Sequence, residues 1–484
     1  MTGRSIDFGK FGLCLALSAL AREVAPPAAA AVGPAFGEPC AAQTGGGHCR
    51  ASSPQGTDDT GLLQASSRPR RGGSPPAEPR QMKLHLMEDK GLDSDVGAVC
   101  LDGSPGAFYF SPGVGEQRND WLIFMEGGGW CTTPWDCFVG RANTTWPTSL
   151  GSSKGYEPIA PAWMNKGINS LNCTISPFCN FSQVFVRYCD GTSFSGNLDE
   201  PVVLRDSNWN EFGKVYFRGQ RIFDAVVDTL LQEFGLNVAR RVLFSGCSAG
   251  GLAATLHADY LHDRLMAAVP NLQKYATAPT SGFFLKHDNV LGEPIYPAQM
   301  QQLFTLSNWT MLSPRCAAAN PSDPRKCNFA QYAAQHIESP FFLINSALDW
   351  WQTRCILADE QWNNGACQLH AGYECASNIT ECVGSQLSAM NGYMDSFMDA
   401  LAGVVDPTSK PGNGAFISGC HFHCEGQEDV PFTTFRINGV TMKDAVYQWW
   451  QGEDTAAVHT HKEQCRFGEG VGCNPSCYVF TSPF

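Results

Sequence analysis

The sequence predicts an α/β fold in which helices cover both faces of a mostly parallel sheet. Short runs rich in β-branched and aromatic residues alternate with stretches of helical spacing along the chain. Hydrophobic residues make up 43% of the 484 residues, which is enough to build a substantial core. In sheets of this kind, chemistry gathers at the carboxyl ends of the strands. Those ends are therefore where functional side chains are expected.

The elements follow in a regular order. A strand runs from Asp120 into three glycines, and another runs from Ser182 into "YCDG". Helical spacing of Ile222, Val226 and Leu230 predicts a helix over 219–235 that closes at a glycine. Three more apolar strands follow, and each ends in polar residues: "RRVLFSG", "PFFLINSALD" and "GAFISGCHFH".

The N-terminal part of the chain predicts export rather than folded structure. Residues 1–21 combine basic residues, a short apolar run and a small-residue cleavage triplet, which is typical of a signal peptide. The run is too short to span a bilayer comfortably, although an uncleaved anchor is the alternative. Residues 22–80 are rich in Ala, Pro, Gly and Ser and are expected to be a disordered leader. Residues 81–484 are expected to form the folded α/β domain.

Composition and charge fit a secreted protein without a stable membrane span. The formal net charge of −13 argues against a nucleic-acid or anionic-membrane partner. The chain holds 21 cysteines, and closely spaced cysteines indicate disulfides formed in an oxidising compartment. The expected close pairs are Cys131/Cys137, Cys173/Cys179, Cys375/Cys382 and Cys473/Cys477. Five Asn-x-Ser/Thr sequons also point to secretion: Asn143, Asn172, Asn180, Asn308 and Asn378.

The stretch "VLFSGCSAGGL" predicts a nucleophile at a sharp turn. Gly246-x-Ser248-x-Gly250 fits the Gly-x-Ser-x-Gly elbow, in which a serine takes a strained backbone between a strand and a helix. Small neighbours are needed because bulk on either side would block the turn. The helix that follows points its positive end at the serine. The alternative is a strand-to-helix joint that merely needs small residues.

A nucleophilic serine needs an acid and a base, which follow it in the sequence in this fold class. Asp349 ends the strand "PFFLINSALD", where a carboxylate emerges at the edge of the sheet. Both His421 and His423 come just after the apolar run "GAFIS", and their positions alone do not separate them. The other three histidines after Asp349 lie in polar or loop-like surroundings: His370, His459 and His461.

Two loops raise further hypotheses. The amide of Ala249 is one expected oxyanion donor, and the glycines of "EGGGWC" allow further amides to converge. A plain glycine turn is the alternative there. The segment Cys420–Cys424 reads "CHFHC", and together with His459, His461 and Cys465 it has the ligand types of a zinc site. In a cysteine-rich secreted chain, disulfides are the favoured fate of these cysteines.

The chain resembles the pectin acetylesterase family, which also contains the Notum carboxylesterases. The resemblance covers about residues 97–450 and is closer to the pectin branch. The flanks of the histidine block depart from it, since plant-type members commonly carry Ser-Cys-Phe-Ala-His-Cys-Gln where this chain has "GCHFHCE". The resemblance rests on sequence blocks that occur in the same order as in the family: "GAVCLDGSPGAFYF", "WLIFMEGGGWC", "VRYCDGTSFSG", "VYFRGQRIFDAVVDTLL", "VLFSGCSAGGL", "NSALDWWQ" and "CHFHC".

The resemblance implies an α/β-hydrolase fold, a serine carboxylesterase activity and no metal or organic cofactor. By motif, it implies Ser248 as nucleophile, Asp349 as acid and His423 as base. The implied oxyanion donors are the amides of Gly129, Trp130 and Ala249. The implied substrate is an acetylated, acidic cell-wall polysaccharide such as pectin, and the implied location is extracellular or in the cell wall. Two alternatives remain: a Notum-like enzyme that removes a lipid acyl group from a secreted protein, and an inactive glycan-binding module.

Overall fold

The computed structural model describes residues 79–143, 150–309, 313–363, 366–406, 408–452, 459–468 and 473–479. The predicted signal peptide and nearly all of the predicted leader lie outside these residues. Among the described helices, none combines the length and the apolar character needed to cross a membrane.

Among the described residues, the central sheet has nine strands in the order β1-β2-β4-β3-β7-β8-β9-β12-β15. The first two strands run antiparallel to their neighbours, and every pairing from β4 to β15 is parallel. The mostly parallel sheet that the sequence predicts is therefore confirmed. The strands are β1 Lys83–Leu86, β2 Ala107–Ser111, β3 Asp120–Met125, β4 Ser182–Val186, β7 Arg241–Cys247, β8 Lys274–Thr280, β9 Phe342–Ser346, β12 Gly414–Ser418 and β15 Thr460–Lys462.

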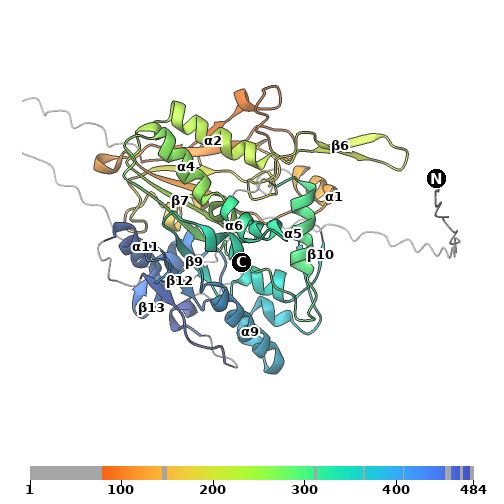
Figure 1. The fold of residues 1–484 in the computed structure, drawn as a ribbon, viewed down its shortest axis with the longest axis vertical. Helices are drawn as coiled ribbons and strands as arrows, with labels where there is room; N and C mark the ends of the chain where they lie inside the picture. The colour runs from red at the N-terminus through yellow and green to blue at the C-terminus, as the bar shows by residue number, and fades with distance from the viewer. Residues whose placement is uncertain are drawn as a thin grey trace, which may run out of the picture. The chain divides into compact units, whose positions relative to one another are not determined.

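Alternate side chains of the buried strands enter two different hydrophobic clusters, because successive residues of a strand point to opposite faces. In β3, Trp121 and Ile123 join the cluster that α2 and α4 cover, whereas Leu122 and Phe124 join the cluster that α11 covers. Figure 1 shows α2 and α4 on one side of β7 and α11 on the other. Both faces of the sheet are thus buried under helices, which explains why its strands read as continuous apolar runs.

The helices are short except for α2 and α9. The helix predicted over 219–235 is confirmed as α2, and Gly235 follows its last turn with a φ of 86°. The helices are α1 Pro134–Cys137, α2 Gly219–Glu233, α3 Ala249–Leu256, α4 Ala258–Ala268, α5 Ile295–Leu306, α6 Pro314–Ala319, α7 Ala330–Ala333, α8 Trp350–Gln352, α9 Gly384–Ala400, α10 Asp429–Thr434 and α11 Met442–Gln451.

In the part of the chain that the structure describes, three two-stranded hairpins lie outside the central sheet. The hairpin of β5 and β6 extends away from the body of the domain (Figure 1). The hairpin strands are β5 Val202–Arg205, β6 Glu211–Val215, β10 Asp359–Asn363, β11 Ala366–Leu369, β13 Arg436–Ile437 and β14 Val440–Thr441.

Candidate active site

Ser248 lies at the sharp turn between β7 and α3. Its φ is 58°, a left-handed value that a residue with a side chain adopts only under strain. A Cβ on Gly246 would lie 2.3 Å from the carbonyl oxygen of Gly250, and a Cβ on Gly250 would lie 2.1 Å from that of Met125. The glycines on both sides are therefore required by the close approach of the main chain, as the sequence pattern predicts.

Asp349 and His423 meet at the carboxyl ends of β9 and β12. Asp349 is fully buried, and its Oδ2 lies 2.7 Å from Nδ1 of His423. The other carboxylate oxygen of Asp349 accepts hydrogen bonds from the amides of Trp351 and Gln352, both at 3.0 Å, at the start of α8. The side chain of His423 keeps 17% of its surface exposed. The aspartate is thus fixed on three donors, and the imidazole reaches the surface.

A disulfide brings the serine turn and the histidine loop together. Cys247, the residue before Ser248, is bonded to Cys424, the residue after His423, with Cα atoms 5.7 Å apart. Both segments also contact the end of β8. The amide of Ser248 donates to the carbonyl of Thr280 at 3.2 Å. The sequence left the state of Cys247 open, and this bond decides it.

His421 lies in a different environment from His423. Its Nε2 lies 3.0 Å from Oγ1 of Thr353, in the turn that follows α8. Burial and, to a smaller extent, the nearby Arg354 lower its pKa to about 4. His421 is therefore neutral near pH 7 and takes part in packing rather than in the contact with Asp349.

The glycine loop after β3 lies directly against the serine turn. A Cβ on Gly127 would lie 2.7 Å from Cβ of Ser248 and 2.2 Å from the carbonyl oxygen of Cys247. Gly129 has a φ of 64°, which a glycine adopts without strain. Trp130 is fully buried, and its indole N–H donates to Oγ of Ser193 at 2.8 Å. Ala249 is the first residue of α3, where main-chain amides lack partners within the helix. The loop and the helix start thus flank Ser248 from two sides.

A buried ion pair that the sequence did not reveal anchors the start of this loop. Glu126 follows β3, Arg187 follows β4, and Nε of Arg187 lies 3.0 Å from Oε2 of Glu126. The same carboxylate oxygen accepts a hydrogen bond from the amide of Tyr188 at 2.7 Å. Glu126 lies in the segment "MEGGG" and Arg187 in the segment "VRYCDG". Only the parallel pairing of β3 with β4 brings the two residues together.

Nine disulfides lie among the described residues, and three of the four pairs predicted from close spacing are confirmed. They are Cys131–Cys137, Cys173–Cys179 and Cys375–Cys382. The prediction of a Cys473/Cys477 bond is wrong, since Cys473 is bonded to Cys465 and Cys477 to Cys420. Close spacing did not decide this case, because the C-terminal segment crosses the histidine loop and offers Cys477 a nearer partner there. The remaining pairs are Cys100–Cys189, Cys316–Cys327 and Cys355–Cys367.

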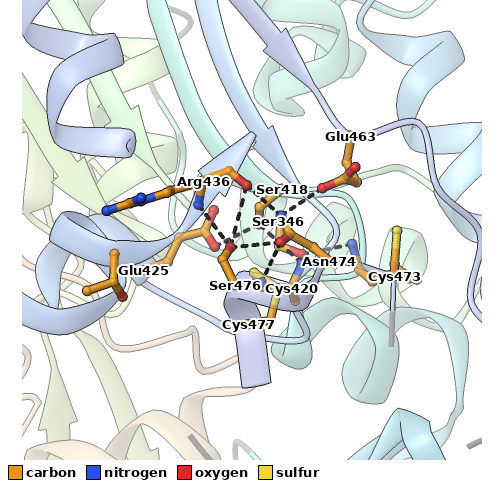
Figure 2. The surroundings of a disulfide bond; sticks show 12 residues. Ser346, Ser418, Cys420, Glu425, Arg436, Glu463, Cys473, Asn474, Ser476 and Cys477 are labelled. Carbon is orange, nitrogen blue, oxygen red and sulfur yellow. Dashed lines mark hydrogen bonds between the residues drawn. A yellow bond between two sulfur atoms is a disulfide. The ribbon is translucent and has the colours of Figure 1, made fainter. Parts of the chain in front are cut away.

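Polar contacts surround the bond between Cys420 and Cys477 (Figure 2). Ser346, at the end of β9, donates its hydroxyl to the carbonyl of Cys420. Asn474 donates its side-chain amide to Oε2 of Glu463 at 2.7 Å and to the carbonyl of Arg436 at 2.8 Å. The disulfide ties the C-terminal segment to the loop that carries His423, and the contacts of Asn474 hold that segment against Arg436 and Glu463.

The hypothesis of a zinc site at "CHFHC" conflicts with these bonds. Both Cys420 and Cys424 form disulfides, so neither offers a thiolate ligand. Donor atoms of Glu463, Cys465 and Cys473 also lie within 4.8 Å of one another, but these two cysteines are bonded to each other. The disulfide alternative that the sequence favoured is confirmed for both cysteines.

Comparisons of this chain with a family model and with known proteins point to the same family. The family model described as Pectinacetylesterase matches residues 77–478. Pectin acetylesterase 5 of Arabidopsis thaliana is 32% identical over 408 residues, which are 82% of this chain and 85% of the relative. Pectin acetylesterase 4 of the same plant is 34% identical over 363 residues, 73% of this chain and 80% of the relative.

Notum carboxylesterases are more distant relatives. The palmitoleoyl-protein carboxylesterase NOTUM of Schmidtea mediterranea is 28% identical over 284 residues, 55% of this chain and 49% of the relative. The solved structure of the Wnt deacylase Notum from Drosophila has a TM-score of 0.63 at 20% identity, and covers 82% of this chain and 100% of that one. This likeness shows the α/β-hydrolase fold that the sequence predicts. The match over residues 77–478 shows that the chain belongs to the pectinacetylesterase family.

Proposed function

We propose that this protein is a serine carboxylesterase that removes O-acetyl groups from pectin or a related acidic polysaccharide. The contact of 2.7 Å between Asp349 and Nδ1 of His423, in a loop cross-linked beside Ser248, is the observation that carries the proposal. Family membership and relatives named as pectin acetylesterases support the esterase class and the substrate.

The reaction runs in two steps. With Nδ1 of His423 held by Asp349, Nε2 is the ring nitrogen that takes the hydroxyl proton of Ser248. The serine oxygen forms a bond with the acetyl carbon, and the amides of Gly129, Trp130 and Ala249 stabilise the resulting oxyanion. The sugar alcohol leaves with the proton from His423. Water then attacks the acetyl-serine, His423 again acts as base, and acetate is released.

We also propose that the protein is exported, with residues 1–21 as its signal peptide, 22–80 as its leader and 81–484 as its catalytic domain, and that it acts outside the cell or in the cell wall. The nine disulfides among the described residues are typical of an oxidising compartment. Side chains of four of the five sequon asparagines are exposed, which leaves them accessible to glycosylation: Asn143, Asn172, Asn308 and Asn378.

The proposal is tested by measuring acetate release from acetylated pectin and hydrolysis of 4-nitrophenyl acetate. Ser248→Ala is expected to lower kcat by about 10⁴-fold or more, because no other hydroxyl replaces the nucleophile. Ser245→Ala is the matched control. This buried serine lies three residues earlier on β7 and donates to the carbonyl of Ala278. Undiminished turnover by Ser248→Ala would exclude Ser248 as nucleophile.

Esters of increasing acyl length separate the proposed substrate class from the alternatives. Faster turnover of acetyl than of long-chain esters is expected for a deacetylase. A preference for long chains would instead indicate a Notum-like lipid substrate. Wild-type protein that binds acetylated pectin but releases no acetate would indicate a glycan-binding module.

A further inference from the structure

The carbonyl groups of the glycine loop are held by two side chains that the triad does not include. The guanidinium Nη2 of Arg141 donates to the carbonyl oxygen of Gly128 at 2.8 Å and to that of Trp130 at 3.0 Å. The hydroxyl of Tyr188 donates to the carbonyl oxygen of Gly129, which lies between them, at 2.8 Å. Three successive carbonyls are thus each held by a side-chain donor.

These contacts determine where the amide hydrogens point. In a trans peptide, the C=O of one residue and the N–H of the next are antiparallel within one plane. Holding the carbonyl of Gly128 on Arg141 therefore fixes the N–H of Gly129 in the opposite direction. Holding the carbonyl of Gly129 on Tyr188 fixes the N–H of Trp130 in the same way. Both amides are proposed oxyanion donors.

The hydroxyl of Tyr188 is itself oriented by a neighbouring loop. The amide of Ser193 donates to this oxygen at 3.1 Å, so the hydroxyl proton is left to point at Gly129. Burial raises the pKa of Tyr188 far above its usual value, and Asp190 raises it further, which keeps the proton in place. The carboxylate of Asp190 in turn accepts hydrogen bonds from the amides of Thr192 and Phe194, both at 3.0 Å. These bonds fix the loop that carries Ser193.

We propose that Tyr188 is a positioning residue of the oxyanion hole, which aims the Trp130 amide by holding the Gly129 carbonyl. This inference rests on the proposed esterase function. Without the hydroxyl, the carbonyl of Gly129 loses its donor, and the peptide between Gly129 and Trp130 can rotate. A flipped peptide presents a carbonyl oxygen to the developing oxyanion instead of an N–H, which repels it.

Tyr188→Phe tests this role, because it removes only the hydroxyl. Activity on 4-nitrophenyl acetate is expected to fall about 10- to 100-fold in kcat, less than or near the loss caused by removing one oxyanion donor. KM should change little, since the contact acts in the transition state. A trifluoromethyl ketone that forms a tetrahedral adduct should lose affinity by the same factor as kcat/KM.

Tyr109→Phe is the matched control, since Tyr109 is also fully buried and its hydroxyl donates to a main-chain carbonyl, that of Glu157, at 2.8 Å. It should lower the melting temperature about as much as Tyr188→Phe while leaving kcat unchanged. Equal kcat values for the two variants, or equal inhibitor affinities, would overturn the positioning role. Failure of the proposed esterase activity looks different, because wild-type protein would then hydrolyse no ester at all.

Discussion

The turn at Ser248 and the loop at His423 lie beside each other, yet different interactions hold them in place. The turn depends on close main-chain approach around two glycines, Gly246 and Gly250, which lie within two positions of Ser248. The loop is tied by two disulfides, through Cys420 and Cys424, to segments far away in the sequence. One half of the candidate site is therefore encoded locally, whereas the other depends on the completed fold.

The largest expected effect concerns the two histidines of that loop. His423→Ala should lower kcat on 4-nitrophenyl acetate by about 10⁴-fold, because the proposed base and its contact with Asp349 are lost. His421→Ala should keep kcat within about tenfold of wild type. It should instead lower the melting temperature, because His421 is half-buried and hydrogen bonded to Thr353. The reverse pattern would assign the base to His421.

The second prediction concerns the covalent link between the two regions. Replacing Cys247 and Cys424 together by alanine opens a loop of 177 residues, which should cost about 5 kcal/mol in the free energy of unfolding on a loop-entropy basis. Replacing Cys173 and Cys179 opens a loop of only six and should cost about 2 kcal/mol. Urea unfolding measures both.

The same two double variants distinguish a catalytic role of the link from a purely stabilising one. Loss of the Cys247–Cys424 bond should lower kcat, since it frees the histidine loop from the serine turn. The Cys173–Cys179 control should leave kcat unchanged. If the folded Cys247/Cys424 variant keeps full kcat, hydrogen bonds such as that from the Cys424 amide to Ser281 suffice to place the loop.

This difference between the regions explains what the sequence predicts well. The strand, turn and helix around Ser248 are recognisable because every required residue lies within a few positions of it. Asp349 is recognisable because it ends an apolar strand. The choice of His423 over His421 came from the family motif, because the two residues follow the same strand and local spacing treats them alike.

Features that depend on pairing across the sheet were not predictable. Tyr188 lies 59 residues from Gly129 in the sequence and reaches it because β4 runs beside β3. Arg141 lies 13 residues from Gly128, in the turn that follows α1, and no local pattern shows that its side chain folds back onto the loop. The Cys473/Cys477 prediction was wrong because spacing cannot show that the C-terminal segment crosses the histidine loop. The antiparallel strands β1 and β2 were not predicted either, because the sequence pattern indicated only the parallel part of the sheet.

For a change of one pH unit, the smallest expected effect concerns a buried acid of the histidine loop. Glu425 is fully buried, and burial raises its pKa to about 8; the hydroxyl of Ser418, which donates to it at 2.8 Å, opposes this rise. Between pH 4.5 and 8 the folded protein therefore holds a proton that the unfolded chain releases. Stability should fall as the pH rises through this range, by on the order of 1 kcal/mol per pH unit.

Glu425→Gln removes this titration while keeping the size of the side chain. Urea unfolding of the variant should depend less steeply on pH between 4.5 and 8 than that of wild type, and the variant should gain relative stability toward pH 8. Below pH 4.5, where both states of the wild type hold the proton, the difference between the two proteins should be constant, which serves as an internal control. Parallel curves across the whole range would mean that Glu425 is ionised in the folded protein. The histidine loop would then differ from the serine turn in its disulfides but not in carrying a buried neutral acid.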